Sequence, residues 1–221
     1  STLPYLETIE VEPDKPATGS VIWMHGLGAD ANDFRPIIPQ LELSSDLAVR
    51  FIFPNAPKIP ITINNGMIMR AWYDVTGFDR RNQDERGIRQ SATWIDEIVT
   101  HEVDHGIPLQ RIVLAGFSQG GAMTLFAGLR RSGLLGGLIC LSGYLPLDQE
   151  LEPLVAEMPK PPIFQAHGTA DPIVSYTLGQ RSHQWLRDAG CQVEWREYPM
   201  GHQVCLEEIR HIGDWLTTVF T

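Results

Sequence analysis

Short apolar runs bounded by glycine or proline alternate with longer segments of helical periodicity along most of this chain. We predict strands at residues 5–11, 20–24, 48–53, 111–115, 137–141, 162–166 and 192–198, five of which are near-continuous apolar runs. The segments between them predict helices at residues 33–40, 84–104, 119–130, 175–189 and 205–220. Such alternation is typical of βαβ units, so we expect a three-layer α/β/α sandwich around a mostly parallel sheet.

The chain is long enough for one domain with a sizeable core, because it has 221 residues of which 43% are apolar. We find no repeat and no shift in composition that would mark a boundary, so we expect a single domain over residues 1–221. Within 84–104, one stripe of helical spacing should face the sheet; it comprises Ile88, Ala92, Ile95, Val99 and Val103.

Charge and cysteine content narrow the classes of partner and compartment. Asp and Glu number 27 against 17 for Lys and Arg, giving a net charge of -10, which disfavours nucleic acid and anionic lipid as partners. We find no apolar stretch long enough for stable membrane insertion, and the N-terminal residues lack the pattern of a signal peptide. An odd number of cysteines, three, argues against a disulfide framework, so we expect a cytoplasmic protein. Because the chain starts at Ser1, removal of an upstream segment stays open.

Residues 54–83 show little periodicity but are rich in large apolar side chains. These are Ile59, Ile61, Ile63, Met67, Ile68, Met69, Trp72 and Tyr73. Loops this long in compact domains are commonly functional, so we expect the segment to pack over the sheet edge and line a site. The alternative is a hydrophobic cover over the core, and self-association into a homodimer could bury part of residues 54–73.

A G-x-S-x-G motif at residues 116–120 follows the apolar run at 111–115 and precedes a helical pattern. This strand–turn–helix context is that of the nucleophile elbow, in which a strained serine projects its hydroxyl above the strand ends. The helix that follows would also favour negative charge developing near Ser118. We therefore interpret Ser118 as a nucleophile; the alternative is a simple N-cap.

A serine nucleophile needs a base and a carboxylate that orients the base. Of the downstream histidines, His202 alone lies in a loop directly after the last expected strand, so it is the expected base. Asp171, in the loop after the preceding strand, is the expected acid, and Asp148 is its rival. The remaining histidines, which are His167, His183 and His211, are interpreted as structural or surface residues.

The reaction also needs amides aimed at the oxygen that becomes negative, worth roughly 3 kcal/mol for each donor. We expect one from Gln119, directly after the nucleophile, and the other from the H-G-L-G sequence at 25–28, where Leu27 is the best candidate. The alternative for 25–28 is a glycine turn that only joins a strand to a helix.

A second pattern, H-E-x-x-H at residues 101–105, matches a zinc peptidase signature. Helical geometry places His101 and His105 away from the apolar stripe, and Gly106 and Pro108 end the helix immediately. We find no third ligand at a suitable spacing. We therefore interpret the pattern as chance similarity and expect no metal site.

Several motifs occur in a specific order over essentially the whole chain. They are H-G-L-G at 25–28, R-A-W-Y-D at 70–74, G-I-P at 106–108, G-F-S-Q-G-G at 116–121, H-G-T-A-D-P at 167–172 and G-H at 201–202. Together they resemble the acyl-protein thioesterase and small carboxylesterase family of α/β-hydrolases. The resemblance implies a triad of Ser118, Asp171 and His202, oxyanion amides from Leu27 and Gln119, and an acyl-binding surface around Trp72. The expected substrate-binding residues are Ile63, Met67, Trp72, Tyr73 and Phe117.

Only about 20 residues separate the strand at 137–141 from Pro162, too few for a cap domain. We therefore expect an open site and a serine hydrolase that cleaves carboxylic esters through an acyl-enzyme, without a cofactor. Residues 28–33 differ from the protein-depalmitoylating relatives, which favours small esters. The alternatives are an acyl-protein (palmitoyl) thioesterase, a lysophospholipase and, more remotely, a non-catalytic binding module on the same fold.

Overall fold

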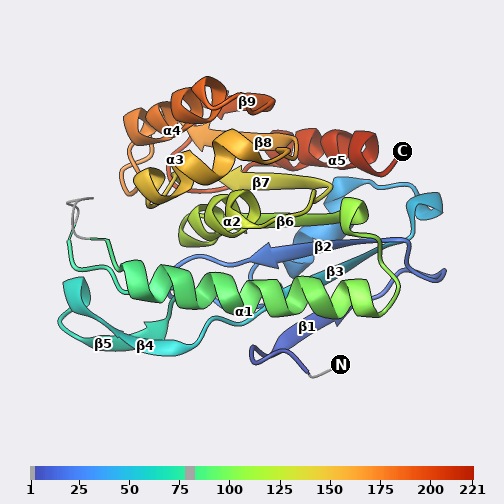
Figure 1. Cartoon of the computed structure of the whole chain (residues 1–221), viewed down its shortest axis with the longest axis horizontal. Coiled ribbons are helices and arrows are strands. Elements are labelled where there is room, and N and C mark those ends of the chain that lie inside the picture. Colours follow the sequence, from blue (N-terminus) through green and yellow to red (C-terminus); the bar gives the residue numbers. More distant parts are fainter. Residues whose placement is uncertain (1–2, 78–82) are drawn as a thin grey trace.

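The computed structural model describes residues 3–77 and 83–221, and its centre is a seven-stranded sheet in the order β1-β3-β2-β6-β7-β8-β9 (Figure 1). The strands are β1 (Thr8–Val11), β2 (Gly19–Met24), β3 (Val49–Pro54), β6 (Ile112–Phe117), β7 (Gly137–Leu141), β8 (Ile163–Gly168) and β9 (Val193–Tyr198). Strand β1 pairs antiparallel with β3, and every other pair in this sheet is parallel. The predicted mostly parallel sheet is thus confirmed.

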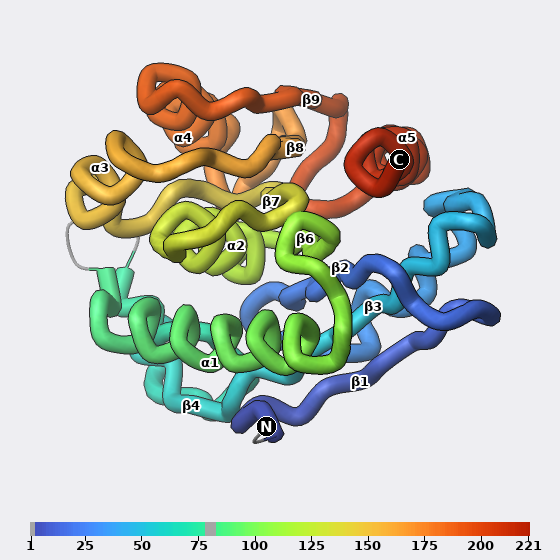
Figure 2. Tube along the Cα trace, turned by 45° about the vertical axis from the view of Figure 1, so that its right-hand side comes forward, coloured from blue at the N-terminus to red at the C-terminus, as the bar shows by residue number. Residues whose placement is uncertain are grey.

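Helices cover both faces of the sheet, as predicted. They are α1 (Glu85–Asp104), α2 (Gln119–Arg130), α3 (Asp148–Glu157), α4 (Tyr176–Asp188) and α5 (Leu206–Phe220). Figure 2 shows α1 to α4 on one side of the sheet and α5 on the other, where α5 packs against the 3₁₀ helix η1 (Arg35–Leu41). The result is three layers, helices–sheet–helices.

Strand β6 shows why these central strands are apolar at nearly every position. Ile112 and Leu114 belong to the core beneath α1 and α2, whereas Val113 and Ala115 belong to the core beneath α5. Successive side chains of a strand point to opposite faces, so a strand covered on both faces buries all of them. Because β2, β6, β8 and β9 all run parallel in the sheet, their carboxyl ends lie at one edge of it, with their loops beyond that edge.

Two parts of the fold were absent from the prediction. Residues 54–83 contain a hairpin of β4 (Lys58–Ile61) and β5 (Met67–Arg70), paired antiparallel as a separate two-stranded sheet. Helix α3 follows β7, in a polar stretch whose Pro153 weakens the helical pattern. The predicted helix at 33–40 is the 3₁₀ helix η1, since Pro39 lies inside it and lacks the N–H that an α-helix would pair with the Arg35 carbonyl.

The apolar stripe on α1 ends earlier than predicted. Val103 is 41% exposed, and the inward position in the last turn belongs to Glu102, which is 2% exposed. The Ser20 hydroxyl donates to Glu102 Oε1 at 2.5 Å, and Arg50 Nε lies 3.2 Å from the same oxygen. Because a partner satisfies the buried carboxylate, a charged residue takes the place that periodicity assigned to valine.

Two further expectations concern disulfides and membrane insertion. All three cysteines are free, and burial raises the pKa of the Cys140 thiol to about 12. Among the described residues, no helix has both the length and the apolar character needed to cross a membrane.

Candidate active site

Ser118 occupies the sharp turn between β6 and α2. Its backbone angles, φ 58° and ψ -116°, are unusual for a residue with a side chain. A Cβ atom on Gly116 would collide with the Gly120 backbone, and one on Gly120 would lie 2.6 Å from the His25 carbonyl oxygen. Glycine at both positions lets the chain turn sharply enough to expose the serine hydroxyl at the sheet edge.

The structure brings Ser118, His202 and Asp171 into one hydrogen-bonded line, although they come from three separate loops. His202 Nε2 lies 2.9 Å from Ser118 Oγ, and His202 Nδ1 lies 2.7 Å from Asp171 Oδ2. A carboxylate oxygen accepts, so Nδ1 carries the proton and Nε2 is left to accept the serine proton.

Asp171 is fixed by its own loop. Its Oδ1 accepts backbone N–H groups from Ile173 at 2.8 Å and Val174 at 2.9 Å, and its side chain is fully buried. The second oxygen is therefore left for His202. The arrangement holds a carboxylate at the far side of the imidazole, as proton transfer to that imidazole would require.

His167, behind Asp171, is also fully buried. Its Nε2 lies 2.8 Å from the Val174 carbonyl oxygen, to which it donates, and 3.6 Å from Asp171 Oδ2. Burial lowers the pKa of His167, which favours the neutral ring. Its place beneath the loop agrees with the structural interpretation of this histidine.

The other candidates considered from the sequence lie elsewhere. His183 stacks on Trp195 with ring centroids 4.8 Å apart, and His211 Nδ1 lies 2.8 Å from the Tyr198 hydroxyl. Asp148 begins α3. The structure brings none of these three into hydrogen-bonding contact with Ser118 or His202 in the described part of the chain.

His101 and His105 stack on each other at the end of α1, with ring centroids 4.1 Å apart. His105 Nδ1 lies 2.7 Å from the His101 carbonyl oxygen. Across residues 3–77 and 83–221, no group of three or more His, Cys, Asp or Glu side chains is arranged to hold a metal ion.

The two predicted oxyanion residues lie beside Ser118. Gln119 begins α2, where the first amides of a helix have no carbonyl partner within it. The loop that carries Leu27 passes close by: a Cβ added to Gly26 would lie 3.5 Å from Ser118 Cβ. In the part of the chain that the structure describes, neither the Leu27 nor the Gln119 backbone N–H donates to another group.

Beside Ser118 lies a cavity of about 540 Å³, which we call the apolar pocket. It is lined by Leu27, Ile63, Asn64, Tyr73, Asp74, Val75, Thr76, Gly77, Gln83, Asp84, Ser118, Gln119, Tyr144, Ile173, Val174 and Leu178. Ile63 and Tyr73 were predicted from the sequence to contact substrate. The Tyr73 and Tyr144 hydroxyl groups hydrogen-bond to each other in its wall.

Three residues predicted to bind substrate are not part of this wall. Trp72 is only 2% exposed and lies behind the pocket, whereas Met67 is 64% exposed on the β4–β5 hairpin. Phe117 packs on the His202 ring, with centroids 4.8 Å apart. A homodimer that covers Met67 stays a prediction.

The apolar pocket also contains three residues that were not predicted from the sequence: Ile173 and Val174 from the Asp171 loop and Leu178 from α4. One signal was available, because a loop that carries the acid to the sheet edge also carries its next residues there. Tyr144, in the loop after β7, had no comparable signal.

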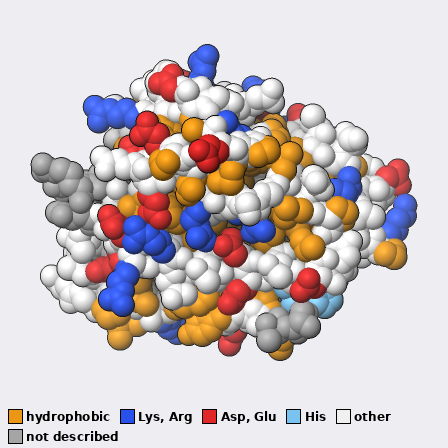
Figure 3. All heavy atoms as spheres, viewed as in Figure 1, with side chains coloured by type: hydrophobic (Ala, Val, Ile, Leu, Met, Phe, Trp, Pro, Cys, Tyr) orange, Lys and Arg blue, Asp and Glu red, His pale blue; other side chains and the backbone are white. Residues whose placement is uncertain are grey.

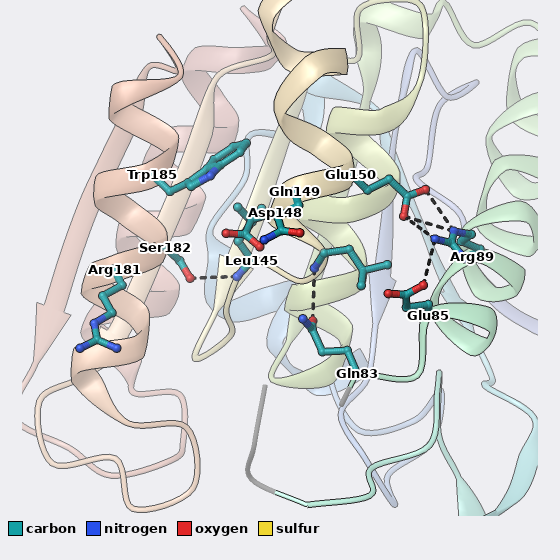
Figure 4. A pocket seen from close by; sticks show the side chains of 11 residues that line it. Gln83, Glu85, Arg89, Leu145, Asp148, Gln149, Glu150, Arg181, Ser182 and Trp185 are labelled. Carbon is teal, nitrogen blue, oxygen red and sulfur yellow. Dashed lines mark hydrogen bonds and ion pairs between the residues drawn. The ribbon is translucent and has the colours of Figure 1, made fainter. Parts of the chain in front are cut away.

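A second and larger cavity, about 800 Å³, lies between the first turns of α1 and α3 and the middle of α4 (Figure 4). We call it the polar hollow; its lining residues are Gln83, Glu85, Arg89, Leu145, Leu147, Asp148, Gln149, Glu150, Arg181, Ser182 and Trp185. Arg89 pairs with Glu150 at 3.0 Å and with Glu85 at 3.3 Å. Acidic and basic side chains are interspersed over the face seen in Figure 3.

The chain is similar to known proteins over most of its length. The model of the phospholipase/carboxylesterase family matches residues 7–220. A Neurospora crassa protein named acyl-protein thioesterase 1 is 45% identical over 214 residues, which cover 90% of this chain and 86% of the relative.

Solved structures are also similar to this chain over more than 90% of its length. Acyl-protein thioesterase 2 from Zea mays superposes with a TM-score of 0.86 at 26% identity, covering 98% of this chain and 100% of that one. Arabidopsis thaliana SOBER1 gives 0.83 at 31% identity, covering 92% and 99%. The chain therefore belongs to the phospholipase/carboxylesterase family, and it is an enzyme of the α/β-hydrolase fold that hydrolyses ester or thioester bonds.

Proposed function

We propose that this enzyme cleaves aliphatic carboxylic esters and thioesters through an acyl-enzyme on Ser118, with the acyl chain in the apolar pocket. The observation that carries the proposal is the hydrogen-bonded line from Ser118 through His202 to Asp171 at the mouth of that pocket. Hydroxyl, imidazole and carboxylate in this order are what nucleophilic catalysis by serine requires.

Each residue has a defined task in the reaction. His202 Nε2 takes the hydroxyl proton while Ser118 Oγ attacks the acyl carbon, whose π electrons move onto the carbonyl oxygen. The amides of Leu27 and Gln119 stabilise that oxyanion. Its collapse breaks the bond to the leaving oxygen or sulfur, which receives the proton from His202, while Asp171 stabilises the imidazolium. Water, activated by His202, then attacks the acyl-enzyme in the same way. Ser118 leaves and recovers its proton, and the carboxylic acid is released.

The pocket favours an acyl group over a polar substituent. Its wall includes Ile63, Val75, Ile173, Val174 and Leu178, so each methylene that enters exchanges water for apolar contact. A buried methylene contributes about 0.8 kcal/mol, or about 4-fold in kcat/KM if the contact is kept in the transition state. We therefore expect kcat/KM to rise with acyl length until the pocket is filled.

Protein-bound acyl groups form the second candidate substrate class. Both the Neurospora relative and the maize structure bear the name acyl-protein thioesterase. The pocket also opens at exposed residues, since Leu27 is 36% and Ile173 60% exposed, and α3 is the one helix described between β7 and β8. A large leaving group could thus remain in solvent while its acyl chain enters the pocket.

A labelling experiment and a substrate series test these points. A fluorophosphonate should label Ser118, located by peptide mass mapping, and heat-denatured enzyme serves as the control. Rates should then be measured for 4-nitrophenyl esters and acyl-CoA thioesters of matched chain length, for a lysophospholipid and for an S-acylated cysteine peptide. Labelling of another serine would refute the proposed nucleophile, and a preference for the peptide over the 4-nitrophenyl ester of equal chain length would assign protein substrates.

A further inference from the structure

The segment Arg70 to Tyr73 is hydrogen-bonded to both halves of the proposed oxyanion hole. One half is the loop at 25–28, which carries Leu27, and the other is the first turn of α2, which carries Gln119. Trp72 lies at the centre of the segment and is 2% exposed. Because it does not line the apolar pocket, its burial serves something other than direct substrate contact.

Trp72 reaches both halves with separate donors. Its indole N–H donates to the His25 carbonyl oxygen at 2.8 Å, and its backbone N–H donates to Gln119 Oε1 at 2.7 Å. The Ser91 hydroxyl on α1 donates to the Trp72 carbonyl oxygen, which anchors the residue from behind. Each bond is buried, so breaking one leaves a polar group without water.

The residues on either side of Trp72 repeat the pattern. The Gly28 N–H donates to the Arg70 carbonyl oxygen at 2.8 Å, and Gln119 Nε2 donates to the Tyr73 carbonyl oxygen at 2.8 Å. Each half of the site is therefore held twice by the same short segment. The segment acts as a fixed spacer between two loops that are far apart in the sequence.

The internal shape of the first half is set by His25. Ala56 N–H donates to His25 Nε2 at 3.0 Å, which leaves the Nδ1 proton to donate to the Gly26 carbonyl oxygen at 2.7 Å. Burial lowers the pKa of His25, so the ring remains neutral. These two bonds fix the internal shape of the loop at 25–28. The bond from the Trp72 indole to the His25 carbonyl oxygen helps to set the position of that loop relative to α2.

We propose that Trp72 is a positioning residue that sets the separation of the Leu27 and Gln119 amides, through the His25 carbonyl on one side and the Gln119 side chain on the other. The inference rests on the proposed function of the site. Two amides stabilise an oxyanion fully only if both point at the same oxygen. A shift of about 1 Å can cost on the order of 100-fold in rate.

The decisive variant is Trp72→Phe, which removes the indole N–H and keeps an aromatic ring in the core. We expect kcat for a medium-chain ester to fall by about 10- to 100-fold, less than for loss of a whole donor, while KM changes little. Trp94→Phe is the matched control. Trp94 belongs to α1 and stacks on Tyr5, away from this site, so the variant should retain full kcat.

A transition-state analogue separates positioning from general damage. A trifluoromethyl ketone forms a hemiketal with Ser118, whose alkoxide occupies the oxyanion hole, whereas the matching secondary alcohol occupies the pocket without forming one. In Trp72→Phe, the inhibition constant of the ketone should rise by the factor by which kcat falls, and that of the alcohol should stay within 2-fold. Equal weakening of both inhibitors would show that the pocket itself is damaged and would overturn the proposal.

A second variant addresses the other end of the spacer. Gln119→Met keeps the backbone amide but removes both side-chain bonds to the spacer, the acceptor for the Trp72 N–H and the donor to the Tyr73 carbonyl oxygen. It should give at least the same loss of ketone binding, with alcohol binding retained. This result keeps the proposal testable if Trp72→Phe fails to fold. Full kcat in both variants would overturn the positioning role alone, whereas full activity in Ser118→Ala would overturn the proposed function.

Discussion

The apolar pocket and the polar hollow each contain a serine, yet among the described residues only the smaller cavity has the groups for nucleophilic chemistry. Ser118 in the apolar pocket lies 2.9 Å from an imidazole nitrogen. Ser182 in the polar hollow accepts a hydrogen bond from the Leu145 N–H at 2.9 Å. A hydroxyl is activated by a base in contact with it, so cavity size is a poor guide to reactivity.

The two cavities also differ in how their walls are held. Neutral hydrogen bonds among buried groups such as His25, Trp72 and Gln119 fix the catalytic side. On the other side, Arg89 forms ion pairs with Glu85 and Glu150, all partly exposed. Buried neutral bonds keep their geometry in salt, whereas exposed ion pairs are screened. The groups around the catalytic residues are therefore held in a more fixed geometry than those around the polar hollow.

Replacing each serine gives the largest expected contrast. Ser118→Ala should reduce kcat by about 10⁴-fold or more, because the nucleophile is lost and only binding and the oxyanion amides remain. Ser182→Ala should retain kcat within about 2-fold, because Ser182 lines the polar hollow and contacts none of the three proposed catalytic residues. Ester hydrolysis by both purified variants, with circular dichroism to verify folding, measures the contrast. A large loss in Ser182→Ala would break the distinction between the cavities.

A change at His25 tests whether its neutral imidazole ring stabilises the loop at 25–28 on the catalytic side. His25→Phe leaves the buried Ala56 N–H without its acceptor and removes one of the two bonds to the Gly26 carbonyl oxygen, which keeps the Ala29 N–H. It should lower the free energy of unfolding by about 1–3 kcal/mol at pH 7.5.

The same variant should alter the pH dependence of stability. A histidine whose folded pKa is lowered binds more protons when unfolded, so the wild type should lose stability as pH falls through about 6.5. His25→Phe should show a shallower loss in urea unfolding between pH 7.5 and 5. In both proteins His167 and His183, whose pKa values burial also lowers, add to the loss, and Glu208, whose pKa burial raises to about 8, opposes it. Identical slopes in the two proteins would contradict a neutral buried His25.

Two substitutions on α4 sharpen the comparison of the two walls. Leu178→Trp should shorten the apolar pocket and lower kcat/KM for a long-chain ester by about 10-fold, with little effect on the acetate. Arg181→Trp, one turn further along the same helix, faces the polar hollow and should leave the chain-length profile unchanged. A matching loss in Arg181→Trp would show that long acyl chains extend into both cavities.

The smallest expected effect concerns the ion pairs of the polar hollow. Arg89→Gln should lower stability by at most about 1 kcal/mol at low ionic strength, and the difference should disappear in 1 M salt. Thermal unfolding at the two salt concentrations measures it. A loss that persists in high salt would indicate that Arg89 supports the fold by packing.

Much of the fold and of the candidate site followed from local pattern. Ser118, Asp171 and His202 lie in the loops that follow β6, β8 and β9, and the carboxyl ends of parallel strands share one edge of the sheet. The sequence order of strands and loops therefore predicted which side chains could meet. Glycines at 116 and 120 added the turn that exposes the hydroxyl.

Other parts depended on contacts that no local pattern encodes. Trp72 and Met67 lie five residues apart in one apolar segment, yet one is buried and the other is at the surface. Their places depend on long-range hydrogen bonds to His25 and Gln119 and on pairing of the hairpin. The prediction that Val103 faces the sheet was wrong for a similar reason. Ser20 and Arg50 stabilise the buried carboxylate of Glu102, one position earlier.

The three groups that line up at the sheet edge come from chain positions 118, 171 and 202, and the last follows the final strand of the sheet. During refolding, helix content can therefore return long before hydrolysis does, because β9 must dock before the imidazole reaches the hydroxyl. Recovery of turnover thus reports completion of the native topology, and a stopped-flow experiment that follows both signals would place the docking of the C-terminal strand in time.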